Sequence, residues 1–83
     1  MELNRLHLGC GRTILEDWIN LDFVALKGVH VFANLDACAE VPLPFEDNII
    51  EEFYGSNLIE HIQHTLSLMQ ELHRIAKPVY KDE

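Results

Sequence analysis

Residues 4–22, N-R-L-H-L-G-C-G-R-T-I-L-E-D-W-I-N-L-D, decide the fold. Polar and apolar residues alternate over 4–8, which predicts a β-strand. Gly9 and Gly11 flank one residue directly after it, a pattern typical of a tight turn. The alternation resumes over 18–24 and predicts a second strand, so this stretch reads as strand, glycine turn, strand.

Working outward, two further strands and one helix follow. We predict strands over 28–35 and 49–55, separated by proline-containing sequence. From Ser56 onward the apolar period changes to three and four residues, which predicts a long amphipathic helix over 57–76 with Ser56 or Asn57 as its N-cap. The apolar stripe of this helix is expected at Leu58, Ile62, Leu66, Met69, Leu72 and Ile75.

These elements predict one domain spanning 1–83, of the α/β class. We expect a Rossmann-like partial sheet of about four mostly parallel strands, with the long C-terminal helix on one face. The connection over 9–17 is short for a parallel crossover, which usually needs a dozen or more residues. Either this crossover is very short or the first two strands are not parallel neighbours; the sequence leaves both open.

Charge and composition exclude some classes of function. The net charge is −8, from 14 acidic and 6 basic residues, and such a surface disfavours binding to nucleic acid phosphates. It is compatible with a cationic ligand. No apolar run approaches a membrane span or a signal peptide, and the two cysteines make no disulfide framework, so we expect a cytoplasmic protein with no membrane contact.

The candidate site begins at the glycine turn. Glycines after a strand let a ligand approach the backbone, where free amide groups can hydrogen-bond it. Asp22 ends the second strand, where nucleotide-binding sheets hold ribose hydroxyls, and a carboxylate can accept from both vicinal hydroxyls. Either feature alone is also common as an ordinary tight turn or a surface aspartate.

Several segments together resemble class I methyltransferases that use S-adenosylmethionine (SAM), most closely the subgroup called methyltransferase type 11. The resemblance covers the chain from about Leu6 to Pro78. It rests on L-H-L-G-C-G (6–11), W-I-N-L-D (18–22), P-L-P-F-E-D-N (42–48), E-F-Y-G-S-N-L-I-E-H-I (52–62) and M-Q-E-L-H-R-I-A-K-P (69–78).

The resemblance implies SAM, or its product S-adenosylhomocysteine (SAH), as the cofactor and methyl transfer as the reaction. It places Gly9, Cys10 and Gly11 beneath the methionine part and Asp22 on the ribose. Near the adenine it implies an acidic position within 34–36, with Asn34 and Asp36 both open. The turn Ser56–Leu58 would face cofactor and substrate, with Ser56 and Asn57 as the candidate cofactor positions in it. It assigns no catalytic residue and no methyl acceptor.

The sequence also departs from the family pattern. His7 stands where an acidic residue is frequent, Thr13 where a third glycine is frequent, and Asn57 where a histidine is common. The family domain continues into further strands after the position of Pro78. We therefore expect a truncated domain that binds SAM or SAH at best and is inactive as an isolated chain, whether by natural truncation, gene splitting or deliberate cutting.

Rival interpretations of single residues are weaker. His61 and His64 are three apart rather than four, so a zincin-like metal site is not expected. Cys10 has no partners placed to make it a nucleophile. The aromatic residues Trp18, Phe23, Phe32 and Phe53 are expected in the core.

The alternative function is a non-catalytic interaction module. The fourth strand would present an open edge, which invites a second copy of the chain or a complementary chain. A nicotinamide dinucleotide site fits less well because Gly9 and Gly11 are not followed by glycine at position 14.

Overall fold

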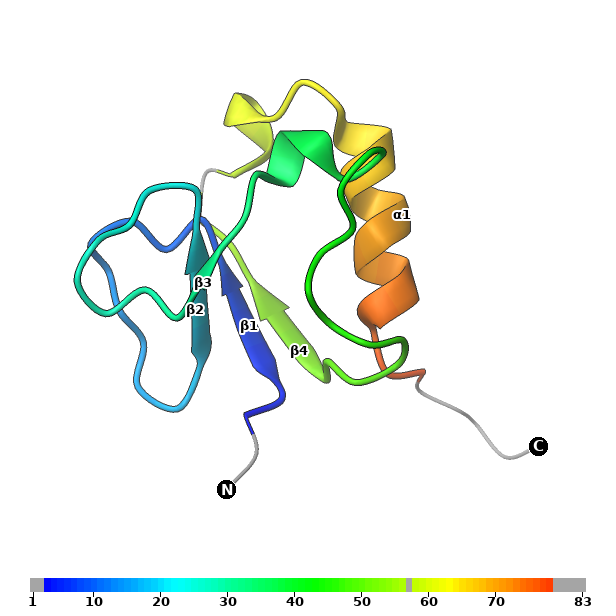
Figure 1. Cartoon of the computed structure of the whole chain (residues 1–83). Helices are drawn as coiled ribbons and strands as arrows, with labels where there is room; N and C mark the ends of the chain where they lie inside the picture. The colour runs from blue at the N-terminus through cyan, green and yellow to red at the C-terminus, as the bar shows by residue number, and fades with distance from the viewer. Residues whose placement is uncertain (1–2, 57, 79–83) are drawn as a thin grey trace.

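The protein is a four-stranded parallel sheet with one α-helix packed on a face (Figure 1). The computed structural model describes residues 3–56 and 58–78. The sheet has the order β3-β2-β1-β4, and every neighbouring pair is parallel. The strands are β1 (Arg5–Leu8), β2 (Ile19–Asp22), β3 (Val31–Phe32) and β4 (Glu52–Tyr54), and the helix is α1 (Thr65–Ile75). This arrangement confirms the predicted α/β, Rossmann-like partial sheet.

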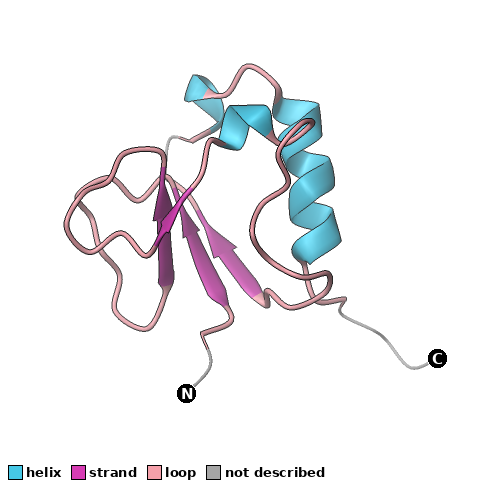
Figure 2. Cartoon of the chain, viewed as in Figure 1, coloured by secondary structure: helices cyan, strands magenta, loops and turns pink. Residues whose placement is uncertain are grey.

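Two short 3-10 turns complete the architecture (Figure 2). The first, η1, spans Leu35–Ala37, and the second, η2, spans Ile59–His61. In Figure 1 both lie near the carboxyl ends of the strands, beside the start of α1. They help to shape the edge of the sheet where the strand ends converge.

The short connection from β1 to β2 is a parallel crossover without regular helix. The buried side chain of Asn20 closes it from inside, because its amide donates to the carbonyls of Leu15 and Trp18 and accepts from the Leu15 N–H. His7, buried on β1, has its Nδ1 3.0 Å from the same Asn20 oxygen. Since that oxygen only accepts, His7 Nδ1 carries the proton. One side chain thus supplies hydrogen bonds that a helix would otherwise provide.

The strands are shorter than predicted at their ends. β2 stops at Asp22 because the carboxylate accepts the N–H groups of Phe23 and Val24, at 2.6 and 3.1 Å, and turns the chain out of the sheet. Phe23 is therefore 70% exposed, and its expected place in the core is wrong. The same correction applies to Phe32 on the edge strand β3, which is 59% exposed.

The core lies between the sheet and α1. Leu6, Leu8 and Leu21 of the sheet meet Leu68 and Ile75 of the helix, and all five are buried. Burial of side chains of this size contributes about 1.5–3 kcal/mol each.

The expected apolar stripe is wrong at Leu66 and Met69, which are 72% and 45% exposed. The fully buried residues of α1 are Leu68, Glu71 and Ile75, so the stripe is confirmed at Ile75, and its members Leu58, Ile62 and Leu72 pack against the core.

The helix begins eight residues later than predicted. α1 starts at Thr65, its N-cap position is His64 without a side-chain cap, and Ser56 is not its cap. The carboxylate of Asp36 accepts the N–H groups of Gln63 and His64, both at 2.9 Å, so these amides point away from a continuous helix. A carboxylate at a helix N-terminus also interacts favourably with the helix dipole. The predicted cap at Asn57 lies outside the described residues.

A partly buried ion pair, Glu71 with Arg74, attaches the segment before β4 to α1. Glu71 accepts the Leu43 N–H at 2.6 Å and the Arg74 Nε–H at 3.0 Å. Arg74 in turn donates to the Leu43 carbonyl and to Asp47. The motifs at 42–48 and 69–78 therefore contact each other directly.

β4 lies at an edge of the sheet. Beyond its far side, the described chain makes one isolated parallel bridge, between Ile50 and Ala76. The Lys77 N–H donates to the Ile50 carbonyl at 2.7 Å, and the Ile50 N–H donates to the Ile75 carbonyl at 2.8 Å. The chain leaving α1 thus covers the approach to β4 rather than β4 itself.

Candidate functional site

A pocket of about 470 Å³ opens where β1, β2 and β3 end. Its volume falls within the range of small-molecule sites, about 300–1,000 Å³. In open parallel sheets, ligands bind outside the carboxyl ends of the strands. The pocket is lined by Gly9, Asp22, Phe23, Ala33, Asn34, Leu35, Asp36, Leu58, His61 and Ile62. Four of the eight predicted cofactor positions are therefore brought around one space: Gly9, Asp22, Asn34 and Asp36.

The turn after β1 has a backbone conformation that favours glycine at two positions. Gly9 and Gly11 have φ values of +60° and +57°, in the left-handed region. A Cβ on Gly9 would lie 2.9 Å from Leu58 Cδ1, whereas a Cβ on Gly11 would meet nothing within 4 Å. Gly9 thus permits close packing at the pocket wall, and Gly11 lies beside open space without lining the pocket.

The turn was expected to offer free amide groups to a ligand, but the N–H groups of Cys10 and Gly11 already have partners within the protein. The Cys10 N–H donates to the Leu21 carbonyl at 3.0 Å, and the Gly11 N–H donates to Asp22 Oδ2 at 2.6 Å. Cys10 itself is buried, its side chain does not line the pocket, and burial first and Asp22 second raise the pKa of its thiol. Its contribution to a site is therefore structural.

Asp22 joins the two loops that begin at the carboxyl ends of β1 and β2. Oδ1 accepts from Phe23 and Val24, and Oδ2 accepts from Gly11. Burial alone would raise the pKa of this carboxyl, but the three N–H groups and nearby His7 together lower it. Asp22 is therefore an ionised carboxylate at neutral pH. Since each oxygen has two lone pairs, Oδ2 keeps one acceptor site for a ligand hydroxyl.

Asn34 and Asp36 line the same pocket but have different structural roles. Asn34 caps η1, because its side-chain oxygen accepts the Asp36 N–H at 2.9 Å. Asp36 anchors the start of α1, and the N–H of His64 is the largest cause that lowers the pKa of its carboxyl. Its Oδ1 is also 3.4 Å from His64 Nδ1. The amide nitrogen of Asn34 is thus the less committed polar group at this wall.

Of the two predicted positions after β4, the structure describes only Ser56. Ser56 is exposed in the bend after β4 and does not line the pocket, and Asn57 lies outside the described residues. Leu58, in the turn expected to face the cofactor, does line the pocket, whereas the sequence interpretation missed Phe23, Ala33, Leu35, His61 and Ile62. The common signal of Phe23, Ala33 and Leu35 is position, since each directly neighbours a predicted residue in the sequence.

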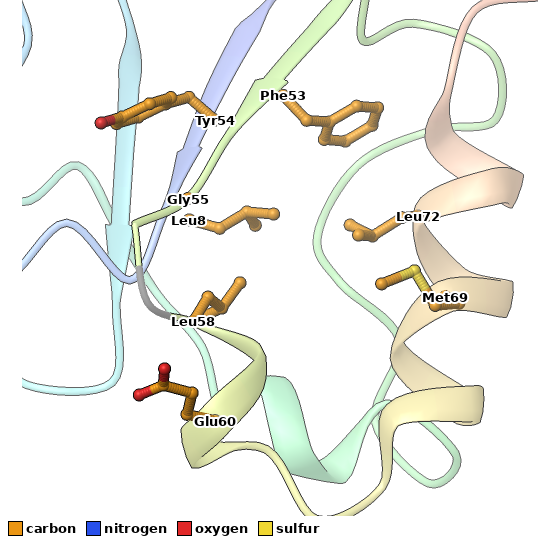
Figure 3. A pocket seen from close by; sticks show the side chains of 8 residues that line it. All are labelled: Leu8, Phe53, Tyr54, Gly55, Leu58, Glu60, Met69 and Leu72. Atoms are coloured by element: carbon orange, nitrogen blue, oxygen red, sulfur yellow. The ribbon is translucent and has the colours of Figure 1, made fainter.

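A second, more apolar pocket of about 410 Å³ lies between β4 and α1. Figure 3 shows Leu8, Phe53 and Leu72 pointing into this space, with Met69 on the helix side and Tyr54 directed to the opposite face of the sheet. On that opposite face Tyr54 packs near His7 and Trp18, with ring centroids 5.2 and 6.4 Å away. Leu58 lines both pockets and separates them.

Among residues 3–56 and 58–78, no three His, Cys, Asp or Glu side chains gather closely enough to hold a metal ion. The part of the chain that the structure describes contains no helix long and apolar enough to cross a bilayer.

Comparison of the chain with models of protein families, with curated proteins and with solved structures gave no match.

Proposed function

We propose that the chain is the SAM-binding part of a class I methyltransferase. The observation that carries the proposal is the pocket at the carboxyl ends of the strands, which gathers Gly9, Asp22, Asn34 and Asp36 from separate segments. These four are among the eight positions that the sequence resemblance suggests for cofactor binding. The parallel order β3-β2-β1-β4 supports a nucleotide site at this edge.

The pocket residues fit the parts of such a cofactor. The open acceptor site on Asp22 suits a ribose hydroxyl, and the ionised carboxylate strengthens that hydrogen bond. Apolar side chains of Leu35, Leu58 and Ile62 offer walls for a flat base. When bound, SAM supplies an electrophilic sulfonium methyl group. The role of these residues is to bind the cofactor and fix its orientation.

The test is calorimetric titration with SAH of the wild-type chain and of Asp22→Asn. The asparagine keeps the size and one oxygen acceptor but removes the charge, so we expect binding to weaken about 10-fold or more. Circular dichroism of both proteins checks that the fold persists. NAD serves as the competing ligand and should bind more weakly than SAH. Equal affinity of the two proteins for SAH, with both folded, would contradict the role of Asp22.

A second candidate is an interaction module that uses the free edge of β4. It is favoured by the position of β4 at the end of the sheet order and by the exposed, apolar Met69 beside it. An unpaired strand edge can accept a strand from another chain. Light scattering after size exclusion tests this: a monomer over a range of tens of micromolar, with no dependence on concentration, would contradict pairing between copies.

A further inference from the structure

A separate pocket of about 460 Å³ lies between the loop after β1 and the loop after β2. It is lined by Arg12, Ile14, Leu26, Lys27 and Gly28. None of these residues lines the pocket assigned to the cofactor. Its two polar side chains are both cations, which is unusual in a chain with a net charge of −8.

The other described cations are neutralised. Arg5 pairs with Glu52 at 2.9 Å, Lys77 with Glu51 at 3.3 Å, and Arg74 with Asp47 at 2.7 Å. Among the described residues, Arg12 and Lys27 are the two Lys or Arg side chains that form no ion pair. Both exposed cations line one pocket, so an anion bound there would be attracted by both.

The backbone presents both cations in defined positions. Arg12 is a central residue of the turn in which the Thr13 N–H donates to the Cys10 carbonyl at 3.0 Å. Lys27 is a central residue of the turn in which the Val29 N–H donates to the Leu26 carbonyl at 3.1 Å. Both turns are four-residue β-turns, so each cation projects from a closed turn rather than from a loose loop.

The two loops are also held against each other. Asp22 accepts the N–H of Gly11 in one loop and of Val24 in the other. Farther along, Ile14 lies so close to Gly28 that a Cβ there would be 2.7 Å from Ile14 Cγ1. The basic pocket is therefore fixed at both ends by contacts between the loops.

We propose that this pocket binds a small organic anion, a phosphate monoester or a carboxylate attached to an apolar body. Arg12 and Lys27 bind the anionic group, since a guanidinium and an ammonium both donate charge-assisted hydrogen bonds to such oxygens. Ile14 and Leu26 pack against the apolar part. The site is independent of the proposed cofactor and stands whether or not the chain binds SAM.

The experiment titrates the chain with phenyl phosphate and with benzoate, followed by amide shifts in NMR spectra. Inorganic phosphate tests the anion alone, and benzyl alcohol tests the apolar part alone. We expect saturable shifts that cluster at residues 12–14 and 26–28, with one of the two anions binding more tightly than inorganic phosphate and than benzyl alcohol. That comparison decides between phosphate and carboxylate as the natural group.

The matched variants are Arg12→Gln, Lys27→Gln and Lys77→Gln, which each remove one positive charge. The first two should weaken binding about tenfold, the usual effect of losing one charge-assisted hydrogen bond, whereas Lys77→Gln should leave it unchanged. Equal weakening by all three would show general charge attraction and overturn the site. Absence of saturable binding, or displacement of phenyl phosphate by SAH, would overturn it as well.

Discussion

Replacing Glu71 should destabilise the fold far more than replacing a neighbouring exposed acid. Glu71 is 8% exposed and accepts hydrogen bonds from the Leu43 N–H and from Arg74. Glu71→Ala leaves the buried Leu43 N–H without its acceptor and takes one carboxylate from Arg74, which keeps Asp47 and the Leu43 carbonyl, so we expect a loss of about 3–4 kcal/mol. Natural domains are stable by about 0.05–0.15 kcal/mol per residue, or roughly 4–12 kcal/mol for a chain of this length. The substitution therefore removes a large share of the total.

The assay is urea unfolding followed by circular dichroism, with Glu71→Gln and Glu46→Ala alongside. The glutamine keeps an acceptor for the Leu43 N–H but loses the charge, so we expect an intermediate loss of about 1.5–3 kcal/mol. Glu46 is exposed in the segment that Glu71 fastens, and its replacement should change stability by less than about 0.5 kcal/mol. Equal stability of Glu71→Ala and Glu46→Ala would refute the reasoning.

The same ion pair predicts a dependence on pH. The hydrogen bonds from Arg74 are the largest cause of the lowered pKa of Glu71, against the opposing effect of burial. A carboxyl whose pKa is lowered by folding stabilises the folded state above its ordinary pKa of about 4.3. The stability difference between wild type and Glu71→Gln should therefore be full at neutral pH and shrink as pH falls below that value.

Three further predictions concern the elements around the site. Asn20→Ala should lower the free energy of unfolding in urea by about 2–4 kcal/mol, because backbone groups of Leu15 and Trp18 lose their hydrogen-bond partner. Asn20→Asp should recover only part of that loss, and full stability of the alanine variant would contradict the role of Asn20 in the β1–β2 connection. Gly9→Ala and Gly11→Ala each place alanine at a positive φ, which costs about 1–2 kcal/mol. Only the alanine at position 9 also meets Leu58, so Gly9→Ala should melt at the lower temperature in calorimetry. The reverse order of melting temperatures would contradict this contact. Asp36→Ala should speed amide hydrogen exchange at the start of α1, and Asp36→Asn should restore part of the protection; unchanged exchange in both would exclude the anchoring contact.

Local sequence patterns predicted where the strands lie better than they predicted where each strand ends. Alternation over 4–8 and 18–24 located β1 and β2, because one face of each strand packs against α1 and must be apolar. β3 is shorter than the predicted 28–35, since His30 hydrogen-bonds Asn20 through its ring and backbone before the strand begins. Such side-chain contacts leave no periodic signal.

The helix shows the limit of periodicity in another way. Its start depends on Asp36, which lies 27 and 28 residues before the amides that it binds. The apolar positions from Leu58 to Met69 fit one continuous helix, so the spacing alone favoured the wrong start and placed the exposed Leu66 and Met69 on the buried face.

Part of the candidate site could be predicted from the sequence because the topology of a parallel sheet brings its strand ends together. Parallel strands end at one edge, so polar residues directly after them converge, as Asp22 and Asn34 do at the pocket. Residues brought there by the turn after β4, such as His61 and Ile62, depend on how that turn packs, and no spacing rule located them.

The central claim is that the pocket at the strand ends holds an adenosine-containing cofactor, and an NMR titration with SAH tests it most directly. We expect saturable shifts at the amides of Gly9, Phe23, Asn34 and Leu58, which lie around the pocket, and none at Glu46, which does not line it. Saturation by SAH but not by NAD would support a methyltransferase cofactor site. A folded chain whose spectrum does not change at these amides would contradict the account.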